Sequence, residues 1–160
     1  MNKTLLLKHI LDELEAVYQV AVDAAMLAYN SATHDENVAE SKYDTLGLEA
    51  SYLAQGQAQR VTECKADLSA FKKLTAMEFS EQIPIAIGAL ITLKDNQGAE
   101  KTLFLGPAAG GLKLIFSQKE MMIITPSAPL GQALLGHFID DYVEVNVAGQ
   151  KQDYEITAVV

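Results

Sequence analysis

A run of apolar residues spaced alternately three and four apart occupies most of the first 28 residues and sets the strongest limit on the fold. This heptad spacing places the apolar side chains on one stripe of an α-helix, and that stripe must pack against a second helix. Thr4 is predicted as the N-cap of this helix. The stripe changes from large residues to alanines, which predicts a narrower end near residue 28. Its members are Leu7, Ile10, Leu14, Val17, Ala21, Ala24 and Ala28.

A second apolar stripe lies within residues 38–74, after a break at "NSATHDENVAE", residues 30–40. The break contains no proline or glycine, and acidic residues replace apolar ones in it. The second stripe weakens at residues 54–59, around Gly56 and Gln57. Two stripes joined by a short break predict an antiparallel coiled coil, in which two long helices form a hairpin. The predicted members of the second stripe are Tyr43, Leu46, Ala50, Leu53, Val61, Cys64, Leu68 and Phe71.

All four prolines and eight of the ten glycines lie after residue 83, which predicts a change of architecture there. Short segments that alternate apolar with polar residues predict an antiparallel sheet. A short helix is predicted to begin at Pro129 and to end at Gly136. The fold class is therefore α+β, with a helical hairpin over residues 1–78 and a small sheet domain with one short helix over residues 83–160. The predicted strands are 88–95, 100–106, 113–116, 121–125, 142–147 and 153–160.

The charge and cysteine content exclude several classes of function. Twelve basic residues stand against 21 acidic ones, and the net charge of −9 does not suit a broad grip on nucleic acid. A protein, a metal or a basic cleft is the expected partner. Cys64 is the only cysteine, so neither a disulfide within the chain nor a thiolate zinc site is expected. The apolar run "LLL" near the N-terminus is too short for a signal peptide or a membrane span. These features predict a cytoplasmic protein without a membrane partner.

One segment resembles a known family. Residues 124–145, "ITPSAPLGQALLGHFIDDYVEV", followed by "DYEITAV", are similar to the C-terminal domain of the bacterial Gre transcript-cleavage factors, GreA and GreB. The resemblance extends back through "IGALITL" and "TLFLGPA". It also includes "DENVAESKYDTLGLEASYLAQGQAQRV", which is similar to the turn and second helix of the family's hairpin. It therefore covers nearly the whole chain, and the C-terminal motif is its most specific part.

The resemblance implies a fold, a partner and a mode of action. It implies an N-terminal antiparallel coiled coil and a C-terminal domain of FKBP-like fold that docks on RNA polymerase. Ser127, Pro129 and Leu130 fall in the docking motif. The hairpin would enter the secondary channel, and carboxylates at its tip would help hold a second Mg²⁺, so that the polymerase cleaves its own backtracked RNA. Asp35 and Glu36 are the catalytic candidates, and Glu40 joins them as a candidate Mg²⁺ ligand.

Two departures from the family pattern concern these same sites. The family's tip has an acid, two further residues and then Glu-Asn, whereas here Thr33 stands three positions before Glu36. Asp35 is adjacent to Glu36, and an acid one residue away points in a different direction from an acid three residues away. In the docking motif, Ala128 stands where the family usually has serine, and Ser127 occupies a position that is often acidic in relatives.

These departures leave several functions open. The first is a cleavage cofactor, which would act on the polymerase's own nuclease activity rather than as an enzyme by itself. The second is a non-cleaving competitor for the secondary channel. The FKBP-like fold raises a third, a prolyl isomerase or chaperone, which would need an aromatic pocket. A helical module that only associates with itself is the fourth. In none of these is sequence-specific binding of nucleic acid expected, and any contact with DNA would be indirect, through the polymerase.

Overall fold

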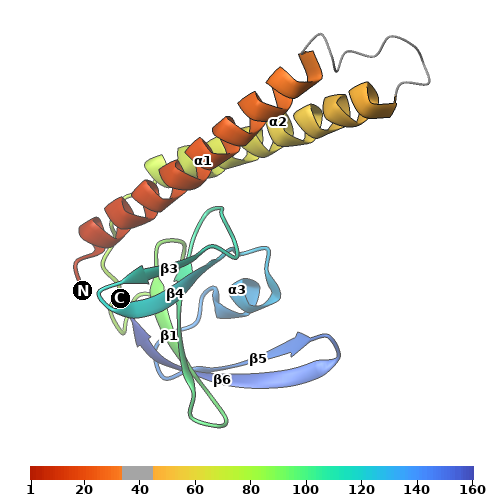
Figure 1. The fold of residues 1–160 in the computed structure, drawn as a ribbon. Helices are drawn as coiled ribbons and strands as arrows, with labels where there is room; N and C mark the ends of the chain where they lie inside the picture. The colour runs from red at the N-terminus through yellow and green to blue at the C-terminus, as the bar shows by residue number, and fades with distance from the viewer. Residues whose placement is uncertain (34–44) are drawn as a thin grey trace. The chain divides into compact units, whose positions relative to one another are not determined.

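The computed structural model describes residues 1–33 and 45–160, and it confirms the predicted fold class (Figure 1). Two long helices, α1 (Lys3–Thr33) and α2 (Thr45–Lys72), precede a sheet domain that contains one short helix, α3 (Pro129–Leu134). The chain forms two compact units. One joins Met1–Leu11 to Ala70–Val160, and the other comprises Asp12–Ser69. Within the described residues, none of the helices has the length and apolar character needed to cross a membrane.

The helix α1 begins at Lys3, two residues earlier than a cap at Thr4 predicted. Asn2 is the N-cap, because its side-chain oxygen accepts a hydrogen bond of 3.1 Å from the backbone N–H of Leu5. The prediction of Thr4 was wrong because asparagine at position 2 satisfies a free N–H of the first turn and leaves Thr4 inside the helix. The helix continues to Thr33, the fourth residue of the segment where the sequence predicted a break.

The predicted stripe on α1 is confirmed, and the stripe on α2 is corrected at Leu53. The predicted Tyr43 and the side chain of Leu46 lie outside the described residues. On α1, Ile10, Leu14, Ala21 and Ala28 are buried, and Leu7, Val17 and Ala24 are half-buried. On α2, Leu53 is 58% exposed and was wrongly placed on the stripe. The burial continues instead from Ala50 to Ala54, a step of four residues that keeps the heptad spacing. Among the described side chains of α2, the shielded positions that follow this spacing are Gly47, Ala50, Ala54, Gln57, Val61, Cys64, Leu68 and Phe71.

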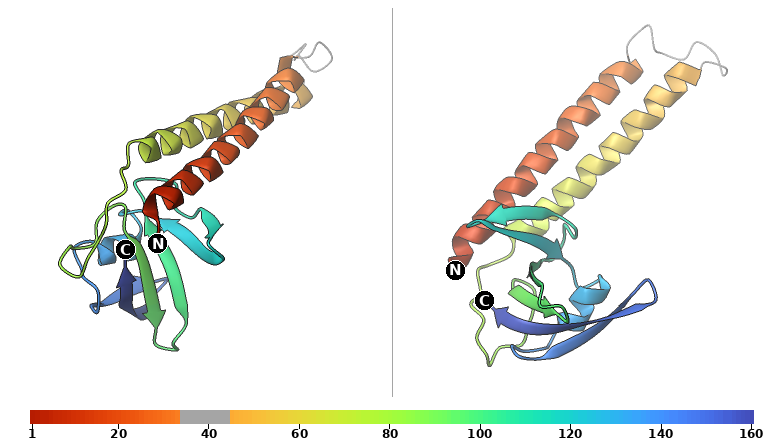
Figure 2. Two further views of the ribbon diagram at one scale, coloured as in Figure 1. Left: turned by 90° about the vertical axis from the view of Figure 1, so that its left-hand side faces the viewer. Right: turned by 60° about the horizontal axis from the view of Figure 1, so that its bottom comes forward.

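Six strands form one sheet in the order β3-β4-β2-β1-β6-β5. The predicted antiparallel sheet is corrected at one pair, because β2 and β4 run parallel. Two chain reversals separate them, one after β2 and one in the β3–β4 hairpin, so β4 returns in the direction of β2. The hairpin of β5 and β6 forms a long ribbon in Figure 2. The strands are Leu90–Asp95, Glu100–Leu105, Lys113–Phe116, Lys119–Ile124, Tyr142–Val147 and Gln150–Val159, numbered β1 to β6.

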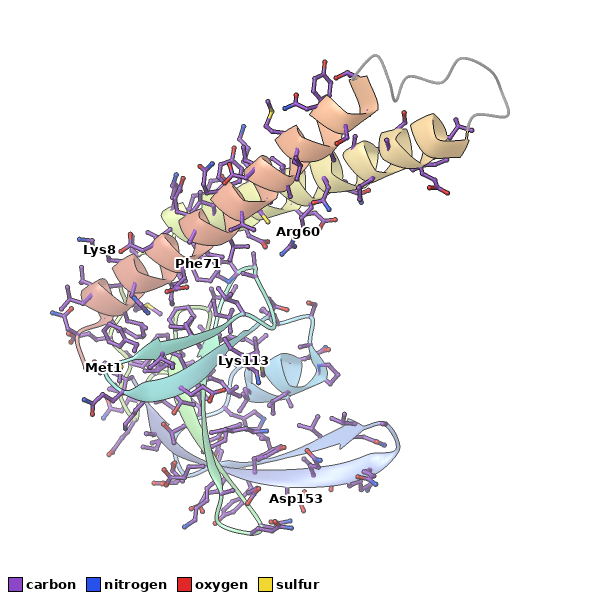
Figure 3. All side chains as sticks on the ribbon, viewed as in Figure 1. Met1, Lys8, Arg60, Phe71, Lys113 and Asp153 are labelled. Atoms are coloured by element: carbon purple, nitrogen blue, oxygen red, sulfur yellow. The ribbon has the colours of Figure 1, made fainter. Side chains whose placement is uncertain are left out.

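Apolar residues cover both faces of the central strands. One face carries the main core, in which Leu103 and Leu105 of β2 pack with Leu134 of α3. The opposite face presents Phe104, whose ring lies 6.2 Å from that of Phe71 at the end of α2. Because neighbouring strand residues point to opposite faces, this explains why three consecutive residues of β2 are all buried. Figure 3 labels Phe71 among the side chains at this end of α2.

Candidate functional site

The candidate docking loop, residues 125–130, connects β4 to α3. The hydroxyl oxygens of Thr125 and Ser127 lie 2.8 Å apart, and the backbone N–H of Ala128 donates to the Thr125 carbonyl at 3.0 Å. Pro129 occupies the first turn of α3, where its missing N–H leaves no helical bond unmade. These contacts hold the loop in one conformation and present Ser127 and Pro129 as exposed residues.

The third predicted docking residue, Leu130, has a different environment. Its side chain is half-buried and packs against the main core, so Ser127 and Pro129 supply most of the exposed surface of the loop. Gly131 is the next residue, and a Cβ added to it would lie 2.0 Å from the Thr125 carbonyl oxygen. Only glycine permits this close approach of α3 to the loop. Gly136 has a φ of +79° just beyond α3, which agrees with its predicted role at the end of the helix.

A second polar group lies at the other end of α3. Nδ1 of His137 is 3.1 Å from Oδ2 of Asp141, and the same oxygen accepts a 2.8 Å hydrogen bond from the backbone N–H of Phe138. The Phe138 N–H lowers the pKa of the Asp141 carboxyl below its ordinary value. Desolvation opposes this shift, and His137 lowers the pKa further. Neither group was predicted as a functional residue, and their bonds serve to order the turn between α3 and β5.

The predicted tip carboxylates, Asp35, Glu36 and Glu40, lie outside the described residues. Thr33 is described, and it is the last residue of α1. Its hydroxyl donates to the carbonyl of Tyr29 at 2.9 Å, which is a bond within the helix. Thr33 therefore supplies no carboxylate at the position where the family pattern has one. Among residues 1–33 and 45–160, no three side chains of the metal-ligating types come close enough together to hold an ion.

The sequence interpretation missed an exposed apolar surface on the helices. Val20 and Leu27 are seven residues apart on α1 and are 69% and 71% exposed. Val20 precedes Ala21 and Leu27 precedes Ala28, and both alanines belong to the predicted stripe. The heptad spacing therefore places Val20 and Leu27 along one edge of the stripe. That spacing was visible in the sequence.

The fold defines a class of protein with a pair of long helices followed by a mixed-sheet domain, in which an exposed loop leads into a short helix. Residues 82–160 match the family model described as "Transcription elongation factor, GreA/GreB, C-term". The C-terminal part of the chain, residues 82–160, belongs to this family of transcription elongation factors. The matched region contains the whole sheet and the candidate docking loop, and the expected family resemblance is thereby confirmed.

Individual relatives are distant. The chain is 24% identical to transcription elongation factor GreA of Xanthomonas campestris pv. campestris over 155 residues, which cover 96% of this chain and 90% of the relative. Among solved structures, GreA factor homolog 1 (Gfh1) of Thermus thermophilus is 16% identical, with 94% of each chain covered and a TM-score of 0.38. Gfh1 of Thermus aquaticus is 18% identical, with 96% of this chain and 90% of that chain covered and a TM-score of 0.39.

Proposed function

We propose that this chain is an elongation regulator that binds RNA polymerase through its docking loop and inserts its helical pair into the secondary channel. The observation that carries the proposal is the family match over residues 82–160, which includes the loop. The exposed Ser127 and Pro129 supply a rigid contact surface there, because Pro129 fixes the first turn of α3. A polymerase partner implies a cytoplasmic location.

Binding to polymerase is tested by pull-down with purified core enzyme. The wild-type chain should be retained, and Pro129→Gly should weaken retention because it frees the backbone at the start of α3. Ser127→Asp restores the acid that the family resemblance implies at this position, so it should strengthen retention. Ser117→Asp, at an exposed turn between β3 and β4, is the matched control for added charge. If the wild-type chain is not retained, the proposed function fails while the fold assignment stands.

Cleavage of backtracked RNA is a separate part of the proposal. Carboxylates suit Mg²⁺, and a second metal ion assists phosphodiester hydrolysis by stabilising the attacking and leaving oxygens. Asp35, Glu36 and Glu40 would be the ligands supplied by this chain, acting with the polymerase. Stalled elongation complexes should then shorten their RNA when the protein is added. Glu36→Ala should abolish this activity without affecting retention on polymerase, whereas Glu49→Ala, on α2, should leave both unchanged.

A non-cleaving channel competitor is the second candidate, and one observation favours it. Thr33 ends α1 without a carboxylate, so the acid pair of the family pattern is incomplete at this position. Under this alternative the protein binds polymerase, fails to shorten RNA, and displaces an active cleavage factor. A Thr33→Asp variant then gains cleavage activity. A prolyl isomerase is less well supported, because the rings of Phe104 and Tyr154 are buried in the sheet domain.

A further inference from the structure

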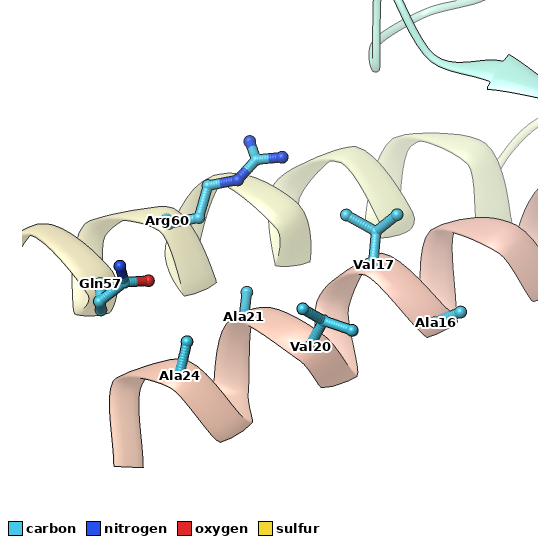
Figure 4. Close-up of a pocket in the computed structure, with 7 residues that line it drawn as sticks. All are labelled: Ala16, Val17, Val20, Ala21, Ala24, Gln57 and Arg60. Carbon is cyan, nitrogen blue, oxygen red and sulfur yellow. The ribbon is translucent and has the colours of Figure 1, made fainter. Parts of the chain in front are cut away.

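An apolar groove lies between α1 and α2, where the two apolar stripes leave space unfilled (Figure 4). Its volume is about 410 Å³. The space exists because α2 contributes Ala54 and Gln57 at positions where a coiled coil ordinarily has large aliphatic residues. The small side chains of α1 do not compensate for them. The groove is lined by Ala16, Val17, Val20, Ala21, Ala24, Gln57 and Arg60.

Three exposed apolar side chains continue this groove along the helices, and we call Val20, Leu27 and Leu53 the apolar flank. They are 69%, 71% and 58% exposed. Val20 lines the groove together with Arg60, which projects from α2 in Figures 3 and 4. Leu27 lies one heptad after Val20, and Leu53 lies one heptad before Arg60, so all three occupy the same side of the helix pair. Exposed apolar residues beside the stripe that joins two helices are typical of helices that also contact a third helix.

The charge of the helical unit restricts what this third helix can be. Residues 12–69 contain eleven acidic and three basic residues, a net charge of −8, whereas the rest of the chain has ten acidic and nine basic residues, a net charge of −1. Nearly all of the net charge of −9 therefore belongs to the unit that bears the groove. A second copy of this unit would bring like charge to like charge, and an anionic surface would be repelled in the same way.

We propose that the groove and the apolar flank bind an amphipathic, basic α-helix of a protein partner. Apolar side chains of that helix, spaced three, four and seven residues apart, would fill the groove and cover Val20, Leu27 and Leu53. Lysine or arginine side chains on its edges would face the acidic residues of the unit, which increases the association rate and excludes acidic partners. Arg60 does not oppose this charge pattern strongly, because Glu63 lies 3.7 Å from its guanidinium. None of these residues belongs to the candidate docking loop or to the predicted tip carboxylates.

A defined peptide tests the proposal without polymerase. The probe is a fluorescent helical peptide of about 18 residues made of leucine and lysine, with the leucines on one face. A peptide of the same composition with the leucines dispersed tests for attraction by charge alone. A leucine–glutamate peptide with the original pattern tests for attraction by apolar contact alone. Fluorescence anisotropy with the full-length protein should detect binding of the patterned leucine–lysine peptide only, and the binding should weaken as salt is raised.

Variants of exposed residues locate the site. Leu27→Ser should weaken peptide binding by about tenfold, since it removes one large apolar anchor from the contact. Because Leu27 is 71% exposed, its replacement should leave the fold intact, which circular dichroism verifies. Tyr142→Ser, at a 70% exposed residue of β5, is the matched control and should bind like the wild type.

Other results would overturn the proposal. They include equal binding of the dispersed peptide, absence of binding by the patterned peptide, and wild-type affinity in Leu27→Ser. A further contrary result is a dimer in analytical ultracentrifugation that Leu27→Ser converts to monomer, because the occupant would then be a second copy. None of these results depends on polymerase, so they are distinguishable from failure of the proposed function.

Discussion

The ammonium group of Lys3, at the first position of α1, donates a 2.7 Å hydrogen bond to the carbonyl oxygen of Met77, 74 residues further along the chain. The same nitrogen lies 4.3 Å from the centre of the Phe79 ring. Lys3 is only 4% exposed, so this charged group is held inside the protein. The two contacts attach the connector between α2 and β1 to the start of α1, within one compact unit.

The burial of Lys3 predicts a dependence of stability on pH. Burial lowers its pKa from 10.5 to about 8, although the charge of Glu78 opposes the shift. Between these two values the unfolded chain binds more protons than the folded one, so the free energy of unfolding rises with pH in this window. Between pH 8 and 10.5, the free energy of unfolding of the wild type should rise by about 1–3 kcal/mol relative to that of Lys3→Met. Urea denaturation at a series of pH values measures the difference.

Lys8→Met is the control for this experiment, because Lys8 is an exposed residue of the same helix. Its stability curve should run parallel to that of the wild type across the window. If Lys3→Met also runs parallel to the wild type, the Lys3 ammonium is not held in the protein as described.

The shifted carboxyl of Asp141 predicts an effect in acid. Its folded-state pKa lies below the ordinary 3.8, so the charged form contributes stability that is present above pH 3.8 and is lost as the pH falls through the folded value. Asp141→Asn retains an oxygen for the Phe138 N–H but removes the charge. The variant should therefore melt at a lower temperature than the wild type near pH 7, and the difference should disappear in strong acid. Asp140→Asn is the neighbouring control, and an equal loss in both variants would show that the bonds to Asp141 are not the cause.

Two glycines predict opposite effects of the same substitution. In Gly131→Ala, the new Cβ would lie 2.0 Å from the Thr125 carbonyl oxygen, and the backbone must shift. We expect this variant to lose about 3 kcal/mol or more of unfolding free energy. Gly56 lies inside α2 with no atom within 4 Å of the position of its Cβ. Gly56→Ala should therefore raise the unfolding free energy by about 0.5–1 kcal/mol, because alanine has a higher helix propensity than glycine. Chemical denaturation measures the unfolding free energy of both variants. Equal stability of Gly131→Ala and Gly56→Ala would contradict the close approach described at Gly131.

The unfilled stripe of α2 predicts that a larger residue will stabilise the helical pair. Gln57 faces the groove, and Gln57→Leu would replace a half-buried polar side chain by an apolar one. The gain should be about 1 kcal/mol, since the added apolar area leaves water. Gln55→Leu, at an exposed residue of the same helix, should give no such gain. Thermal unfolding followed by circular dichroism measures both variants, and equal midpoints would mean that the groove does not accept the leucine.

Heptad spacing and strand alternation are local properties, which explains why they predicted so much of the fold. The stripe of α1 was read correctly from Leu7 to Ala28, and all six strands were placed within a few residues of their observed positions. The error at Leu53 has a similarly local cause. Heptad spacing allows the residue after Ala50 on the stripe to be either Leu53, three residues on, or Ala54, four residues on. Leu53 was chosen because leucine is more apolar than alanine, but Ala54 is the shielded residue.

Contacts between distant segments were not predictable in this way. The parallel pairing of β2 and β4 depends on where the chain crosses after Leu105, and neither strand encodes the direction of its neighbour. The candidate docking loop was located by its motif, yet only the structure shows that Leu130 packs inward while Ser127 and Pro129 remain exposed. The tip carboxylates were also placed by the family motif, and their roles stay predictions.

The sequence by itself determined the two helical stripes, the strand pattern, the family motif and the concentration of negative charge in residues 12–69. These follow from periodicity and composition, which are properties of neighbouring residues. Only the tertiary structure decided that β4 joins β2 in parallel, that Lys3 is buried against Met77, and that a groove remains beside Val20. Each of these depends on which surfaces meet after folding, and packing between segments far apart in the chain sets that outcome.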